Sequence, residues 1–194
     1  MDVNIIENKR LDEIAQIYNG LRITRYRDYE KGSLHKVLKK INNKENILET
    51  EEVKLCGKID EKFYSKQNDI IIQQTSQVNT INIIDKDDIV VPANYVTIRT
   101  KEQYNPHYIK YLLTSTQFKK VERKIVGGTK LQFIKIPDIK RMKLKIPPQE
   151  KQEKIVNILK LIDKKNKLEE KKIKLNKNIQ NAILRKQLGE EYVQ

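Results

Sequence analysis

The chain has 194 residues, of which 38% are hydrophobic and 34% charged, and its formal net charge is +14. This length suits one globular domain plus one long element. No stretch approaches the roughly 18–20 apolar residues of a membrane span, and MDVNIIENKR has no secretory apolar core, so we expect a cytoplasmic protein without a membrane partner. One cysteine, Cys56, excludes an internal disulfide bond, and with only His35 and His107 beside it we expect no metal site and no cofactor.

Positive charge is concentrated in one segment, residues 117–147, which contains ten Lys or Arg residues against Glu122 and Asp138. Clustering of this kind is typical of a nucleic-acid-binding surface, although a solvated basic surface would give the same pattern. The charge therefore favours a polyanionic partner without identifying it.

The first predicted element is a short helix over residues 9–18, KRLDEIAQIY, which Gly20 can end. A strand or extended loop is expected next, because arginines alternate with Ile, Thr and Tyr in residues 22–27. Arginine contacts guanine edges and phosphates in bidentate fashion, and tyrosine can stack or bind phosphate. The DNA-binding candidates here are Arg22, Arg25, Tyr26 and Arg27.

Residues 30–66 suggest several short strands separated by polar turns such as INNKEN. The triplet Glu52-Val53-Lys54, with Asp28 upstream, has the residue types of some nuclease metal sites. Such a triplet is expected by chance in a chain with this many charges, so we assign no catalytic residue.

An antiparallel β meander is predicted over residues 68–100, with strands at IIIQQ, INII and IVVPANYVTIRT. Pro92 indicates an edge or a bulge in the last strand. The polar loop after the first strand contains amides and hydroxyls that can pair with base edges, so Gln73, Gln74 and Ser76 are further DNA-binding candidates.

A helix is predicted to begin at Asn105 and Pro106 and to run to the two glycines at 127 and 128. The glycine-containing turn GGTKLQF is basic, and its backbone amides could approach a phosphate closely. The candidates in this region are Lys124, Gly127, Gly128, Thr129 and Lys130. A short helix near PDIKRM follows, and the domain is expected to end at KLKIPP.

The last predicted element is one long helix from the two prolines at 147 and 148 to Gly189. At 1.5 Å per residue it would be about 55–60 Å long, more than one small domain can cover, so we expect it to pair in a coiled coil. The alternative is a terminal helix folded back on its own domain. The predicted dimerisation residues are Ile155, Ile158, Leu161, Ile162, Leu168, Leu175, Ile179 and Ala182.

The succession LDEIAQIYNG, NDIIIQQ, NPHYIKYLLTSTQF and IPDIKRMKLKIPPQEKQEKIVNILKLID resembles a target recognition domain and its following helix in specificity subunits of type I restriction-modification systems. The most specific part is IPPQEKQEKI. The resemblance implies an α+β fold: a recognition domain at residues 1–146 with a small antiparallel or mixed β-sheet and short helices, a coiled-coil helix at 147–189, and a tail at 190–194.

Members of this family typically carry two recognition domains and two spacer helices that pair antiparallel, whereas this chain has one of each. It therefore resembles a half subunit that forms a homodimer and binds double-stranded DNA at two inverted half-sites. The resemblance also implies a non-catalytic role in positioning adenine methyltransferase subunits and, in complete systems, a restriction subunit. The sequence contains no phosphate-loop, dinucleotide or N-P-P-type methyltransferase motif.

Two other functions remain open on the sequence. One is a dimeric coiled-coil adaptor whose basic face binds an acidic protein. The other is a DNA-binding regulator with the shape of a specificity subunit but without restriction-modification activity.

Overall fold

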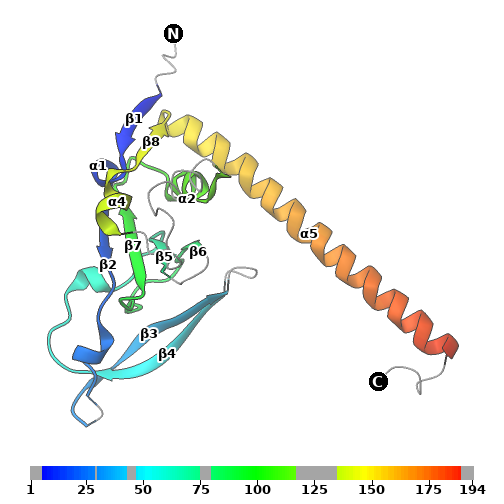
Figure 1. Ribbon diagram of the computed structural model, residues 1–194, viewed down its shortest axis with the longest axis horizontal. Helices are drawn as coiled ribbons and strands as arrows, with labels where there is room; N and C mark the ends of the chain where they lie inside the picture. Colours follow the sequence, from blue (N-terminus) through cyan, green and yellow to red (C-terminus); the bar gives the residue numbers. More distant parts are fainter. Residues whose placement is uncertain (1–5, 29, 43–46, 75–79, 117–134, 189–194) are drawn as a thin grey trace. The chain divides into compact units, whose positions relative to one another are not determined.

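A computed structural model of the chain describes residues 6–28, 30–42, 47–74, 80–116 and 135–188. The chain forms two compact units, Met1–Gln152 and Glu153–Gln194. The first unit is a mixture of short helices and antiparallel strands, and the described part of the second is a single helix (Figure 1). The expected α+β class is confirmed.

A four-stranded antiparallel sheet, in the order β2-β7-β5-β6, forms the centre of the first unit. Its strands are β2 (Ala15–Asn19), β5 (Ile70–Gln73), β6 (Thr80–Ile83) and β7 (Tyr95–Thr100). The β-branched run Ile70–Ile72 is fully buried, as suits a central strand.

The predicted meander is wrong in the place of its last strand. A meander would pair β7 with β6, whereas β7 pairs with β5 on the side away from β6. The expected long last strand is also shorter, since β7 begins at Tyr95 and Pro92 lies before it. Proline has no N–H to donate to a strand ladder, and here Pro92 forms only an isolated bridge with Leu21.

A second, two-stranded sheet joins the two ends of the first unit's sequence. Its strands are β1 (Glu7–Arg10) and β8 (Lys143–Ile146), which pair antiparallel. The helix predicted over 9–18 is wrong beyond one turn, because α1 covers only Leu11–Ile14 and β2 follows directly. Ala15 and Ile17 are buried while Gln16 is exposed, so the apolar spacing there is that of a strand.

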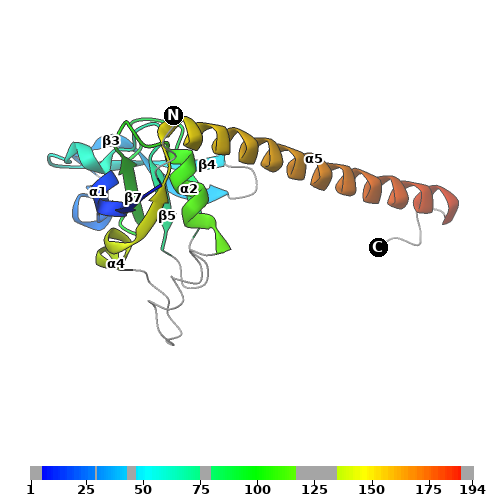
Figure 2. The same cartoon turned by 90° about the horizontal axis from the view of Figure 1, so that it is seen from above.

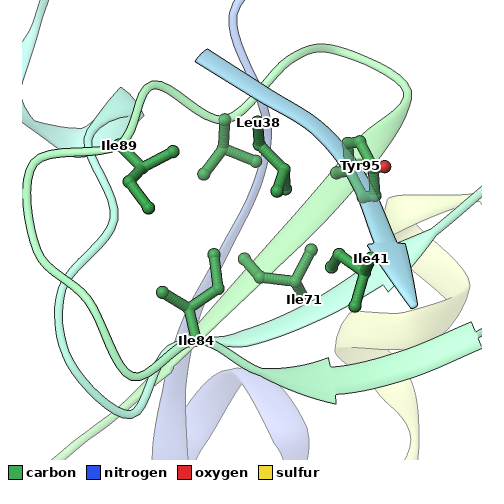
Figure 3. Packing of buried hydrophobic residues seen from close by; sticks show 7 residues of the cluster. Leu38, Ile41, Ile71, Ile84, Ile89 and Tyr95 are labelled. Carbon is green, nitrogen blue, oxygen red and sulfur yellow. The ribbon is translucent and has the colours of Figure 1, made fainter. Parts of the chain in front are cut away.

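The third sheet is a long hairpin, β3 (Ser33–Asn42) with β4 (Ile47–Leu55), rather than several short strands. The register of the hairpin shifts between Leu38 and Lys40. Val37 and Leu38 are neighbours on β3 and point to opposite faces, so they belong to two different core clusters. Figure 3 shows Leu38 and Ile41 packed against Ile71 and Tyr95 of the central sheet. The second cluster consists of Leu21, Val37, Val53, Leu55 and Val90.

Two predicted helices lie beside the sheets. α2 (Pro106–Thr114) starts where expected, because the Asn105 side chain accepts hydrogen bonds from the backbone N–H groups of His107 and Tyr108. α2 itself ends at Thr114, whose hydroxyl donates to backbone carbonyls within the helix. The part of the predicted helix from residue 117 onward lies outside the described residues. α4 (Ile136–Arg141) confirms the helix near PDIKRM and packs against α1 and β2. Figure 2 shows α4 on the same side of the first unit as α1.

The long helix is confirmed as α5 (Gln149–Leu188), which has 40 residues. It begins directly after Pro147 and Pro148, and the carbonyl of Pro148 accepts the first backbone hydrogen bonds, from Lys151 and Gln152. In the described ranges no helix is long and apolar enough to cross a membrane.

Candidate functional site

Two groups of predicted DNA-binding residues emerge from one end of the central sheet. The pairs Asn19↔Val96 and Gln73↔Tyr95 place the last residues of β2 and β5 beside the first residues of β7. Arg22 follows β2 closely in the sequence, and Gln74 follows β5. We call this region the distal end and define it as residues 19–28, 73–74 and 92–95.

A close backbone contact fixes where the arginine segment leaves the sheet. The N–H of Gly20 donates to the carbonyl of Tyr95 at 2.9 Å, and the N–H of Leu21 donates to that of Val91 at 2.7 Å. A Cβ atom on Gly20 would lie 2.1 Å from the carbonyl oxygen of Pro92, so only glycine fits. This contact sets the starting point of Arg22.

The arginine segment was predicted to be a strand or an extended loop. Instead, it forms a single 3-10 turn at Ile23–Arg25. Ile23 and Tyr26 pack against the second core cluster, and the backbone carbonyl of Tyr26 accepts a hydrogen bond from the N–H of Cys56 at 2.7 Å. Tyr26 is therefore half-buried and packs toward the core, although the sequence made it a DNA-binding candidate together with the arginines. The side chains of Arg22, Arg25 and Arg27 are exposed, as is that of Thr24.

Gln73 and Gln74 are half-buried at the distal end. The backbone N–H of Gln74 donates to the carbonyl of Asn94 at 2.9 Å, which holds the end of β5 against the segment before β7. The backbone that carries the two glutamine side chains is therefore held in place by the sheet. Ser76 lies outside the described residues, as do Lys124, Gly127, Gly128, Thr129 and Lys130.

The described part of the basic segment lies elsewhere, on α4 and β8. Its cations are Lys135, Lys140, Arg141, Lys143 and Lys145. β8 pairs with β1, which precedes α1 and β2, whereas the distal end follows β2. The segment after β2 and strand β8 therefore lie at opposite ends of the first unit, as Figure 1 shows.

Sequence reasoning missed that pairing, although a signal was present. Lys143-Leu144-Lys145-Ile146 alternates polar and apolar residues with the period of a strand, and Leu144 and Ile146 are buried while the lysines are exposed. The partner strand could not be inferred, because Glu7–Arg10 is polar throughout.

The acidic groups near the distal end have structural partners. The Asp28 carboxylate accepts hydrogen bonds from the backbone N–H groups of Glu30 and Lys31, and these bonds lower the pKa of Asp28. On the hairpin, cross-strand neighbours such as Lys36↔Glu52 have opposite charges. Among the described residues no cluster of three or more His, Cys, Asp or Glu side chains could hold a metal ion.

Comparison with known proteins decides the family. The family described as the type I restriction modification DNA specificity domain matches residues 6–177. The chain belongs to this specificity family. A search of curated proteins gave no match.

Solved structures of specificity subunits share the fold. The HsdS subunit from Thermoanaerobacter tengcongensis is 15% identical, with a TM-score of 0.62 over 85% of this chain and 39% of that one. The S subunit from M. genitalium is 16% identical, with a TM-score of 0.58 over 99% and 48%.

A chain from a structure described as the basis of "complex assembly and conformational transition of the type I R-M system" is 15% identical, with a TM-score of 0.66 over 92% and 43%. This specificity-family chain thus spans less than half the length of each of these three structures.

Proposed function

We propose that this chain is a sequence-specific DNA-binding specificity subunit of the half-subunit type, which forms a homodimer through α5 and recognises a bipartite DNA site. On this proposal it is not catalytic. It positions methyltransferase subunits, and in a complete system a restriction subunit, on the DNA. The first unit corresponds to the recognition domain and α5 to the spacer.

One observation carries the dimer proposal: the apolar residues of α5 are exposed at coiled-coil spacing. Leu161, Leu168 and Leu175 recur every seven residues and are 67%, 58% and 57% exposed. Ile158 and Ile179 extend the same row at three- and four-residue steps and are 59% and 50% exposed. A solvent-exposed row of this length is costly in water, so we infer that a second helix covers it.

The chemistry of the row suits a helical partner. Leu161, Lys164, Lys165 and Leu168 border a shallow hollow on the helix surface. Four residues at this spacing form the hole that receives one side chain of a facing helix in a coiled coil. Lys165 and Lys172 interrupt the row, and their long stems can cover apolar surface while the ammonium groups reach water. A second copy of the chain is the occupant we propose.

The distal end is the base-reading surface on this proposal. Arg22, Arg25 and Arg27 are exposed on a segment held by the core, and Arg is the residue type that most often reads guanine. Gln73 and Gln74 supply amides that can pair with adenine. Contacts from rigid elements are better positioned than contacts from long loops. This favours base reading over non-specific binding as the role of the distal end.

The test combines mass in solution with selection of bound duplexes. We expect the full chain to be a dimer by light scattering and to enrich duplexes with two inverted half-sites from a random pool. Leu161→Lys with Leu168→Lys should give a monomer that stays helical, because Leu and Lys have similar helix propensities.

Gln180→Lys with Asn181→Lys is the matched control, since it adds the same two lysines to exposed positions off the row. This variant should remain a dimer. A monomeric full chain would end the homodimer proposal, and failure to enrich any duplex would end the DNA-recognition proposal.

A further inference from the structure

The two-stranded sheet β1–β8 has one buried and one outward face. Leu144 and Ile146 point inward, being 7% and 4% exposed. The alternate positions of both strands are all exposed and polar. We call these four residues the outer face: Asn8, Arg10, Lys143 and Lys145.

The outer face juxtaposes like charges. Arg10 lies directly opposite Lys143, and Asn8 lies opposite Lys145. Like charges directly opposite each other on a sheet are destabilising. Asp12 offsets one of these charges, because its carboxylate accepts hydrogen bonds from the Arg10 guanidinium at 2.6 and 3.0 Å.

No comparable partner offsets the two lysines. The ammonium groups of Lys143 and Lys145 make no ion pair or hydrogen bond with any residue in the described ranges. Lys9, on the inner face of β1, differs: its ammonium group lies 2.6 Å from Glu7 and donates to the Tyr104 hydroxyl at 3.1 Å. These bonds raise the pKa of Lys9. Lys9 on the inner face and Arg10 on the outer face thus have acidic partners, whereas Lys143 and Lys145 on the outer face have none among the described residues.

We propose that the outer face binds the phosphate backbone of double-stranded DNA, as a second contact that is independent of sequence and separate from the distal end. The inference rests on the proposed function, which supplies the DNA. Two features favour phosphates over an acidic protein. Lysine is depleted from protein–protein interfaces, and the outer face offers no apolar side chain to form the centre of one.

The geometry also suits a linear polyanion. Lys143 and Lys145 are two residues apart on one strand, so their α-carbons are about 6.6 Å apart along it. Cations repeated at this interval can meet successive phosphates of one DNA strand. Arg141, at the end of α4, is exposed and continues the series by two residues. Because the outer face and the distal end are at opposite ends of the first unit, the two contacts would engage separate stretches of the duplex.

The experiment measures the salt dependence of binding to a long duplex of mixed sequence, using the full chain and fluorescence anisotropy. For Lys143→Gln with Lys145→Gln, the slope of log K against log salt should become shallower by about 0.9 for each phosphate that a protomer no longer neutralises. Affinity should fall by the same factor for every duplex sequence, since phosphate contacts carry no sequence information.

Lys167→Gln with Lys174→Gln is the matched control, because it removes the same charge from exposed positions on α5 off the apolar row. It should leave the slope close to that of the unchanged chain. The β8 variant should also unfold at the same or a higher temperature, since it removes the Arg10–Lys143 repulsion.

Equal slopes of log K against log salt for the two variants would overturn the inference, because the change would then reflect the net charge of the chain and not a contact at the outer face. An unchanged slope for the β8 variant would also overturn it, as expected if an acidic protein occupies the outer face. Both results leave the proposed function standing, provided that the unchanged chain binds the duplex. If the unchanged chain binds no duplex, both proposals fail together.

Discussion

At the scale of single residues, the central sheet contains two buried hydroxyl groups, those of Tyr18 and Thr97. Tyr18 and Thr97 lie opposite each other on β2 and β7, and neither hydroxyl has a hydrogen-bond partner among the described residues. A buried polar group without a partner costs free energy, so its removal can be neutral or stabilising. Burial raises the pKa of Tyr18 to about 12.

Tyr18→Phe tests this assignment. At neutral pH we expect the free energy of unfolding to change by less than about 1 kcal/mol, or to rise. The folded-state pKa of Tyr18 exceeds the unfolded value of about 10, so above pH ~10 the unfolded chain loses the phenol proton more readily than the folded chain. The free energy of unfolding is therefore unaffected by this group below pH ~10 and falls as the pH rises toward 12. Denaturant unfolding between pH 7 and 11.5 should therefore show a smaller alkaline loss in the variant. A marked destabilisation at pH 7 would mean that the hydroxyl has a partner.

At the scale of elements, a side chain in the first turn of α5 bonds to the rest of the first unit. Gln152 is 1% exposed, its amide oxygen accepts from the backbone N–H of Asn105, and its amide nitrogen donates to the carbonyl of Pro147, both at 2.9 Å. Asn105 in turn caps α2. One glutamine therefore joins the start of α2 to the start of α5.

Gln152→Leu should lower the free energy of unfolding by about 1–3 kcal/mol, because it removes the hydrogen-bond partner of one part-buried and one buried backbone group. Urea unfolding followed by circular dichroism measures this change. Gln180→Leu, the same substitution at an exposed position of α5, should change the value by less than about 0.5 kcal/mol. Equal effects of the two substitutions would show that the Gln152 bonds contribute little.

At the scale of the whole molecule, the proposed homodimer would double the effect of a single substitution. In a homodimer each base-reading side chain is present twice, once at each half-site. Removing one base-reading side chain costs about 1–3 kcal/mol, so the cost for a dimer bound to a symmetric site is about twice that.

Arg25→Gln should therefore relax the same position in both half-sites of the selected duplexes and leave the other positions unchanged. Duplex selection with the variant chain, followed by competition binding, measures both effects. Lys54→Gln, an exposed cation on the neighbouring hairpin, is the comparison. If Arg25→Gln weakens all duplexes alike, Arg25 contacts phosphate and does not read bases.

The sequence by itself determined the elements whose signals are local. The long helix follows from two prolines and an uninterrupted run to Leu188, α2 begins at an Asn-Pro cap, and the run Ile70–Ile72 identifies a buried strand. The exposed arginines after Gly20 were also identifiable, because charged side chains are seldom buried without a partner.

Only the tertiary structure decided which distant segments pair. Residues 15–19 form a strand rather than the end of a helix because β7 supplies their hydrogen-bond partners, and Glu7–Arg10 is a strand because β8 does. Pairing of this kind depends on contacts far apart in the sequence, which local propensity does not encode. The pairing also brought Arg22 and Gln73 to one end of a sheet and set Lys143 opposite Arg10, while packing against the hairpin made Tyr26 part of the core.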